Sequence, residues 1–403
     1  MRSRPFLAVM AAALIAPALL ASPAAAAPPP APGPTPDTSG TKRLAGDDRY
    51  FTAAAIVQDS YPAGPVPVVF IATGEDYPDA LAGGPAADLL GGPVLPVAKA
   101  GIPASILSEL DRLDPARIII LGGPGAISEA IATQLQSYTQ GAVERIAGLN
   151  RYDTAAKVAK QVFTGPVPQV LIATGLGFAD ALAGGAVGAN TDSPVLLVSK
   201  DSLPAETADA LRQLQPRNIA VLGGTAVVSD AVLEQLRGFT AGGVNRLSGN
   251  SRYETAAAIT RVFWPATTNV VYLATGLNFP DALSGVPAAG RDGAPLLLVD
   301  KSCMPAATKQ ELDRLQPTTI VVLGGINTVS DAAVAGNSCA PPPPPPPPSP
   351  EPSQPPNPGD TKNCSDFRTQ AEAQSYFDFY YPYYGDVARL DRDNNLRACE
   401  DLP

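Results

Sequence analysis

The sequence predicts an α/β protein in which one domain with a parallel sheet occurs three times in tandem. Similar openers, each running from an arginine to an Arg-Tyr pair, stand at Arg43–Tyr50, Arg145–Tyr152 and Arg246–Tyr253. An Ala-Thr-Gly block follows each opener, and its threonine recurs with a period of 101 residues, at Thr73, Thr174 and Thr275. Recurrence at a fixed period marks a repeated structural unit, so we conclude that one domain has been triplicated.

Within each copy, short apolar runs alternate with stretches of helical spacing, most clearly in the second copy. Its strand-like runs are 169–173, 194–198 and 219–222. Its helical stretches are 180–189, 205–214 and 230–236. Apolar runs without a polar face are typical of parallel strands covered by helices on both sides, so we expect a doubly wound layer. Each run ends in Thr-Gly or Gly-Gly, and ligands of such sheets bind beyond the carboxyl ends of the strands.

The first residues have the pattern of an export signal. A basic start precedes an apolar run from Phe6 to Leu20, and small residues follow it. That run is shorter than the ~20 residues of a membrane-spanning helix, which disfavours the alternative of a membrane anchor. We therefore predict a signal peptide over residues 1–26 and a flexible Pro-rich leader over residues 27–40.

The remaining chain divides into repeats, a linker and a tail. The repeats are expected at 41–142, 143–243 and 244–340. An uninterrupted proline run, Pro341–Pro348, then opens a polyproline linker over residues 341–359. Polyproline II extends ~3.1 Å per residue, so we expect a semi-rigid spacer, with recognition by a Pro-binding domain as the alternative. Residues 360–403 are too few for a large core and are expected to form a separate small domain.

Composition excludes several classes of function. The chain has 38 acidic and 28 basic residues, a formal net charge of −10, and no histidine. A general nucleic-acid binder carries a basic face, so we expect no nucleic acid as a partner. The lack of histidine removes the catalytic triads, general bases and zinc sites that depend on this residue. No second long hydrophobic stretch follows the first one, so we also expect no membrane span.

The repeated blocks resemble a known family. They read Arg-(Leu/Ile)-x-Gly-x-x-Arg-Tyr-x-Thr-Ala, then Ala-Thr-Gly with (Pro/Ala)-Asp-Ala-Leu-(Ala/Ser)-Gly, then (Val/Ile)-Leu-Gly-Gly. Over about residues 43–338 this pattern is similar to the type 2 cell-wall-binding repeat family. The resemblance implies three Rossmann- or Toprim-like domains in a pseudo-threefold arrangement, and non-covalent attachment to anionic polymers of a Gram-positive wall. Two departures are Ala179, which replaces Pro, and Val286, which replaces Gly.

One arginine in each opener is a candidate for polymer binding, because a guanidinium grips phosphate or carboxylate with two hydrogen bonds. These arginines are Arg49, Arg151 and Arg252. The favoured alternative is an internal ion pair with an aspartate that recurs in every unit. Those aspartates are Asp79, Asp180 and Asp281, which also precede Ala-Leu helices and are therefore expected as helix N-caps rather than catalytic groups.

Strand-end lysines and threonines are further ligand-binding candidates. The lysines are Lys99, Lys200 and Lys301, each able to neutralise a phosphate as a point charge or simply to lie in solvent. The threonines are Thr73, Thr174 and Thr275, whose Thr-Gly turns could present backbone N–H groups to an anion. The glycine spacing matches neither a dinucleotide fingerprint nor a P-loop. Since the protein is acidic, polymer binding needs local basic clusters, helix N-termini or bridging divalent cations.

The four cysteines allow three disulfide connectivities. In an exported protein, small domains are commonly stabilised by disulfides. We predict the pairs Cys303–Cys339 and Cys364–Cys399, because the members of each pair lie within one expected folded unit.

The tail contains a candidate calcium loop. Its ligands are expected to be Asp391, Asp393, Asn395, Glu400 and the backbone carbonyl of Arg397, in the alternation that lets a tight loop point oxygens at one cation. The tail is similar to the Excalibur extracellular calcium-binding domain, which implies calcium as the cofactor. Asn and Leu stand where that family carries Asp and Gly, and Glu400 comes earlier than in an EF-hand. A metal-free loop that only maintains the fold is therefore the alternative.

The tail also has a run of aromatic residues. They are Tyr376, Phe377, Phe379, Tyr380, Tyr381, Tyr383 and Tyr384. In so small a domain we expect most of them in the core, with stacking on sugars as the alternative.

Taken together, these features predict a secreted, non-enzymatic protein that binds a secondary wall polymer or peptidoglycan. One alternative is a wall hydrolase; a zinc amidase would need histidine, whereas composition leaves a glycosidase with paired carboxylates open. A second alternative is an extracellular receptor for a small molecule or nucleotide. The polymer, and the partner of the tail, are not specified by the sequence.

Overall fold

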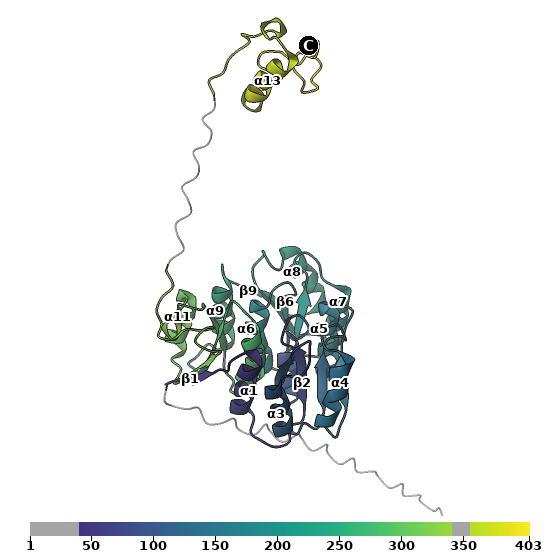
Figure 1. Ribbon diagram of the computed structural model, residues 1–403, viewed down its shortest axis with the longest axis vertical. Helices are drawn as coiled ribbons and strands as arrows, with labels where there is room; N and C mark the ends of the chain where they lie inside the picture. Colours follow the sequence, from purple (N-terminus) through teal and green to yellow (C-terminus); the bar gives the residue numbers. More distant parts are fainter. Residues whose placement is uncertain (1–39, 341–354) are drawn as a thin grey trace, which may run out of the picture. The chain divides into compact units, whose positions relative to one another are not determined.

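A computed structural model describes residues 40–340 and 355–403 (Figure 1). The predicted signal peptide, most of the Pro-rich leader and most of the polyproline linker lie outside these residues. The chain divides into two compact units, one ending at Cys339 and one beginning at Ala340, and each is described by itself.

The first unit contains three parallel four-stranded sheets, as predicted. The first sheet has the order β3-β2-β4-β5. Its strands are β2 (Val69–Thr73), β3 (Val94–Val97), β4 (Ile118–Leu121) and β5 (Val143–Ile146). Its helices are α1 (Arg49–Ser60), α2 (Gly83–Leu89), α3 (Ala104–Leu113) and α4 (Glu129–Leu135), which continues as the 3₁₀ turn η1 (Gln136–Tyr138).

The second sheet repeats this design with the order β7-β6-β8-β9. Its strands are β6 (Gln169–Thr174), β7 (Val195–Val198), β8 (Asn218–Leu222) and β9 (Val244–Leu247). Its helices are α5 (Arg151–Val162), α6 (Ala179–Asn190), α7 (Ala205–Leu214) and α8 (Asp230–Leu236), followed by η2 (Arg237–Phe239).

The third sheet has the order β11-β10-β12-β1. Its strands are β10 (Val270–Thr275), β11 (Leu296–Val299), β12 (Thr319–Leu323) and β1 (Gly40–Leu44). Its helices are α9 (Arg252–Phe263), α10 (Pro280–Arg291), α11 (Ala306–Leu315) and α12 (Asp331–Val334). The predicted α/β class and the three parallel sheets are thus confirmed.

The three repeats close into a ring because the first strand of each repeat joins the sheet of another. Strands β5 and β9 extend the sheets of the repeats before them, and β1 extends the third sheet by pairing with β12. The first arginine of each opener reinforces this exchange. Arg43, for example, donates to the carbonyl oxygens of Gly324 (2.9 Å) and Val329 (2.8 Å). Each sheet therefore contains three strands from one sequence repeat and a fourth strand from another repeat.

Helices α2, α6 and α10 pack against one another around the pseudo-threefold axis. At equivalent positions they carry Gly84, Gly185 and Val286, and the Val286 side chain lies between the other two helices. A Cβ atom on Gly84 would come 2.4 Å from Val286 Cγ1, and one on Gly185 would come 3.1 Å from it. The axis therefore has room for one branched side chain, which accounts for the departure at Val286 seen in the sequence.

Three aromatic rings meet in the segments that lead into these helices. Tyr77 lies 5.6 Å from Phe178 and 5.6 Å from Phe279, and the two phenylalanine rings are 6.1 Å apart between centroids. Each repeat contributes one ring, so the contact fixes the three strand ends relative to one another.

The second unit is a small domain built on η3 (Cys364–Asp366) and α13 (Gln370–Tyr384). Its core includes Ala373, Phe377 and Leu390. Both predicted disulfides are confirmed, Cys303–Cys339 in the first unit and Cys364–Cys399 in the second.

The expectation that most of the tail aromatics form its core is wrong. Phe377 is buried, but Phe379 is 56% exposed and Tyr381 and Tyr383 are exposed as well. The reason is geometric: consecutive residues of one helix point in all directions, and the short chain after α13 covers one face of it.

Candidate functional site

The candidate arginines are held by the repeat to which they belong. Arg151 Nη1 donates to the carbonyl oxygen of Gly175 (2.6 Å), and Arg49 and Arg252 make the same contact with Gly74 and Gly276. Each guanidinium is thereby fixed beside the Thr-Gly turn at the carboxyl end of a central strand. Each arginine uses its Nη1 group in this contact. The acceptor is a backbone carbonyl oxygen, not the aspartate of the predicted ion pair.

Two of the recurring aspartates interact with arginines of a different repeat. The Arg252 guanidinium acts on Asp180, and that of Arg49 acts on Asp281, so electrostatic attraction crosses the boundaries between repeats. Neither pair is within ion-pair distance among the described residues. The expectation of N-capping is also wrong, because the caps of α2, α6 and α10 are Ala82, Phe178 and Phe279. Asp180 and Asp281 lie one residue inside the first turn, and Asp79 lies before it.

Each aspartate instead lies against the first glycine of a Gly-Gly turn. These glycines are Gly122, Gly223 and Gly324, with φ values of 97°, 103° and 101°. A Cβ atom there would come 2.5, 2.6 and 2.5 Å from the Oδ2 atoms of Asp79, Asp180 and Asp281. Glycine is thus required both by the left-handed backbone and by the neighbouring carboxylate.

Burial changes the acidity of two of these groups. It raises the pKa of Asp180 and of Asp281 to about 6, and the nearby arginine from the next repeat opposes this shift. At neutral pH both carboxylates are therefore ionised, at a cost to the folded state.

The predicted threonines stabilise turns. Thr73, Thr174 and Thr275 are buried, and their hydroxyl oxygens accept from the backbone N–H two residues later, each at 3.2 Å. The N–H groups of the following glycines donate to the carbonyl oxygens of Val97, Val198 and Val299. These donors are satisfied within the protein, so they do not face an anion as expected.

The predicted lysines are placed differently. Lys99, Lys200 and Lys301 are exposed at the ends of the second strands. In residues 40–340 as described, their ammonium groups have no hydrogen-bond or ion-pair partner. Lys99 also lines a cavity of about 490 Å³ together with Thr73, Glu75 and Asp76. The lysines are therefore cations available to a ligand.

Two pockets lie at the boundaries between repeats, at the carboxyl ends of the strands. The pocket between repeats two and three, called here the 2–3 pocket, has a volume of about 430 Å³ and is lined by Phe178, Asp180, Asn250 and Arg252 among others. Its counterpart between repeats three and one, the 3–1 pocket, has a volume of about 220 Å³ and contains Asp281.

Sequence reasoning missed the aromatic residue and the asparagine. An aromatic residue precedes the recurring aspartate by two positions in every copy, at Tyr77, Phe178 and Phe279. That regularity was an available signal. Asn250, in contrast, has no counterpart of its kind in the other openers, where Asp47 and Leu149 stand, so repetition could not reveal it.

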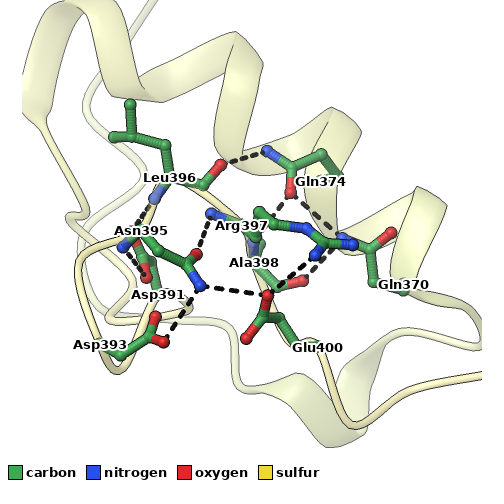
Figure 2. Close-up of polar contacts among 9 residues, drawn as sticks. All are labelled: Gln370, Gln374, Asp391, Asp393, Asn395, Leu396, Arg397, Ala398 and Glu400. Atoms are coloured by element: carbon green, nitrogen blue, oxygen red, sulfur yellow. Dashed lines mark hydrogen bonds and ion pairs between the residues drawn. The ribbon is translucent and has the colours of Figure 1, made fainter.

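The loop of the tail brings the predicted calcium ligands together (Figure 2). Buried Asp391 accepts from the backbone N–H groups of Asn395 (3.1 Å) and Leu396 (2.8 Å). The Asn395 amide donates to Asp393 (3.0 Å) and to Glu400 (3.1 Å). Asp393 and Glu400 thus converge on the side-chain amide of Asn395, whereas Asp391 holds the backbone of the turn.

Helix α13 holds this loop in place. Gln374 donates to the Leu396 carbonyl oxygen (3.1 Å) and accepts from the Ala398 N–H (2.8 Å), as Figure 2 shows. Leu396 has φ 66°, at the position where calcium loops of this spacing carry Gly. The loop therefore keeps the sharp turn of a calcium loop despite the bulky residue.

The donor set has the right chemistry for calcium, since three carboxylates and an amide oxygen are hard oxygen ligands. In the structure, however, the Asn395 amide hydrogens lie between Asp393 and Glu400, and the Arg397 guanidinium is 3.3 Å from Glu400. In the described residues, no group of three or more acidic, histidine or cysteine side chains is arranged to hold a metal ion. A bound cation would have to take the place of these internal donors.

Comparison with known proteins supplies the family. The model of cell wall binding domain 2 (CWB2) matches residues 43–132, 145–233 and 246–334. The chain belongs to this family. The model of the Excalibur calcium-binding domain matches residues 361–400. Among the described helices, none is both long and apolar enough to cross a membrane.

Two of the relatives are proteins of one bacterial strain. The chain is 30% identical to "N-acetylmuramoyl-L-alanine amidase LytC" of Bacillus subtilis (strain 168), over 72% of this chain and 57% of that protein. It is 32% identical to the "Amidase enhancer" of the same strain, over 67% of this chain and 36% of that protein.

The structural neighbours agree with this assignment. Cwp6 from Clostridium difficile superimposes with a TM-score of 0.68 and 28% identity, covering 75% of this chain and 49% of that one. Cwp8 from the same species gives 0.66 and 25%, covering 72% and 50%. The chain thus spans about half the length of the relatives that it matches.

Proposed function

We propose that this chain is a secreted wall protein without enzymatic activity, which attaches non-covalently to a glycan or anionic polymer through its three repeats. The observation that carries the proposal is the threefold match to the cell wall binding domain 2 family, realised as one closed ring. The similarity to the two Bacillus subtilis proteins lies in this part of the chain and supports shared attachment.

The face at the carboxyl ends of the strands is the proposed binding surface. It carries the unpartnered Lys99, Lys200 and Lys301, together with the pockets at the repeat boundaries. Since the net charge of the chain is −10, long-range attraction does not draw an anionic polymer to it. Affinity would come from several local contacts, which the ring presents on one rigid body and which add through avidity.

A non-enzymatic role is supported by chemistry. An amidase of the zinc type requires ligands that include histidine, and this chain has none. The recurring aspartates Asp79, Asp180 and Asp281, one in each repeat, lie against glycine turns rather than facing one another as a pair.

The tail is proposed to bind calcium as an accessory module. Asp391, Asp393, Asn395 and Glu400, with the Arg397 carbonyl, would hold the ion, which would supply a cross-link that fixes the loop. Millimolar affinity is expected, because Asn replaces one carboxylate and Arg397 competes for Glu400.

Sedimentation with purified cell wall tests the attachment. The full-length protein is expected to co-sediment saturably with intact wall, and less with wall from which the secondary polymers have been stripped if these are the ligand. Retention of the protein in the supernatant with both preparations, with and without calcium, would reject the proposal. Release of soluble fragments from labelled peptidoglycan would reject its non-enzymatic part.

A further inference from the structure

We propose that the 2–3 pocket binds one uncharged sugar residue of the N-acetylated hexosamine class, and that the equivalent positions of the ring do not. This inference rests on the proposed attachment of the repeats to a wall polymer. It specifies which unit of such a polymer the pocket recognises.

The pocket is built by all three repeats. Repeat one contributes Tyr77, repeat two contributes Phe178 and Asp180, and repeat three contributes Asn250 and Arg252. Its volume of about 430 Å³ falls within the ~300–1,000 Å³ of small-molecule sites. It therefore exists only in the closed ring and is large enough for one sugar ring with a substituent.

The charges that line the pocket favour an uncharged ligand. They are the Asp180 carboxylate and the Arg252 guanidinium, one of each sign. A phosphate bound to Arg252 would also face Asp180, and an ammonium group bound to Asp180 would face Arg252. Hydroxyl and amide groups suit both, because they donate to a carboxylate and accept from a guanidinium.

Arg252 is oriented for such a role. Its Nη1 atom is held by the Gly276 carbonyl oxygen, and its guanidinium carbon lies 5.8 Å from the centroid of the Phe178 ring. Among the described residues, its other N–H groups have no acceptor. They are free to donate to a carbonyl or hydroxyl oxygen of a ligand.

Another part of the pocket lining is apolar. Tyr77 and Phe178 provide ring surface, and Leu176 and Val227 provide aliphatic surface. The C–H face of a pyranose and the methyl group of an acetamido substituent are also apolar, and pack on such side chains. An N-acetylated hexosamine combines this apolar face with an amide and hydroxyl groups, so it matches both the apolar and the polar lining residues.

The other two boundaries lack this combination. The 3–1 pocket is half the volume, is lined by Asp47, Asp48 and Asp281 against Arg49, and has no aromatic lining residue. At the boundary of repeats one and two, Glu75 stands in the position of Leu176, and Leu149 in that of Asn250. The sugar site is therefore specific to one boundary.

A cavity-filling substitution tests the site. Gly224 lines the 2–3 pocket, and a Cβ atom there meets nothing within 4 Å, so Gly224→Leu should fill the pocket without disturbing the fold. The matched control is Gly123→Leu, at the equivalent glycine of repeat one, which is equally unobstructed. Asp180→Asn is a second variant that removes the carboxylate and keeps its shape.

The probe is N-acetylglucosamine, with binding to the full-length protein followed by saturation-transfer NMR and titration calorimetry. Wild type and Gly123→Leu should bind it equally, whereas Gly224→Leu and Asp180→Asn should each weaken binding at least tenfold. Glucosamine and inorganic phosphate should bind at least tenfold more weakly than N-acetylglucosamine. Equal binding by Gly224→Leu and wild type, or displacement of the sugar by phosphate, would overturn the inference.

Wall sedimentation run in parallel separates the two proposals. If the wild-type protein sediments with wall but binds no N-acetylglucosamine, the sugar site is wrong and the attachment stands. If it does not sediment with wall, the proposed function itself fails.

Discussion

The packing at the pseudo-threefold axis predicts that one branched side chain can be moved from one repeat to another. Val286 is 2% exposed, and replacing it with Gly removes about 2 kcal/mol of buried aliphatic contact and adds about 1 kcal/mol for a helical glycine. Gly84→Val places a Cβ atom 2.4 Å from Val286 Cγ1, and such overpacking costs about 1–3 kcal/mol. The double variant Gly84→Val/Val286→Gly removes the clash and fills the gap.

We therefore expect Val286→Gly to lose about 3 kcal/mol and Gly84→Val about 1–3 kcal/mol, with the double variant within about 1 kcal/mol of wild type, a strongly non-additive result. Urea unfolding followed by tryptophan fluorescence measures this, because the chain has one tryptophan, Trp264, which is buried and donates to the Gly293 carbonyl oxygen. Gly238→Ala, where a Cβ atom meets nothing within 4 Å, is the control and should leave the midpoint unchanged. Additive losses in the double variant would refute this description of the axis.

Three further predictions follow from named groups. Since burial raises the pKa of Asp281 to about 6, the stability linked to it is fully present below its ordinary pKa and is lost as pH rises through 6. Asp281→Asn should thus match wild type at pH 4 and exceed it by up to ~3 kcal/mol at pH 7.5 in the same unfolding assay; equal pH profiles would contradict the assigned burial. Leu396→Gly should stabilise the tail domain by ~1–2 kcal/mol in hydrogen exchange of the full-length protein, because the left-handed backbone at φ 66° strains Leu; unchanged or faster exchange of α13 would count against the loop geometry. A triple variant with Gln at positions Lys99, Lys200 and Lys301 should bind intact wall more weakly, and its binding should depend less on salt concentration. Its unfolding midpoint should not change, because these side chains are exposed and unpaired. Wall binding as strong as that of wild type would show that the three lysines are not part of the binding surface.

Much of the fold could be predicted because apolar runs and their period report burial directly. The run predicted at 169–173 is β6, and the stretch predicted at 205–214 is α7. The closure of the ring could not be predicted in this way. Strand β1 pairs with β12, which lies far along the chain. The sequence of a short edge strand does not indicate which other strand it pairs with.

In the candidate site, a residue could be predicted from the sequence where its role depends on its own position and not on its neighbours in space. Exposed lysines at strand ends follow from position alone. The role of Arg252 depends on the Gly276 carbonyl oxygen and on Asp180 of another repeat. The spacing of residues along the sequence reveals neither backbone acceptors nor contacts between repeats. The tail aromatics were misjudged for a related reason, since composition cannot show which face of α13 the following loop covers.

Hydrogen exchange of the full-length protein, with and without saturating soluble wall fragments, tests most directly whether the repeats bind the wall through one face of the ring. The account predicts slowed exchange in the strand-end segments 73–77, 174–180 and 246–255, and unchanged exchange at the opposite edge of the second sheet, around residues 165–168 and 238–242. Protection confined to that opposite edge, or to residues 360–403, would contradict it.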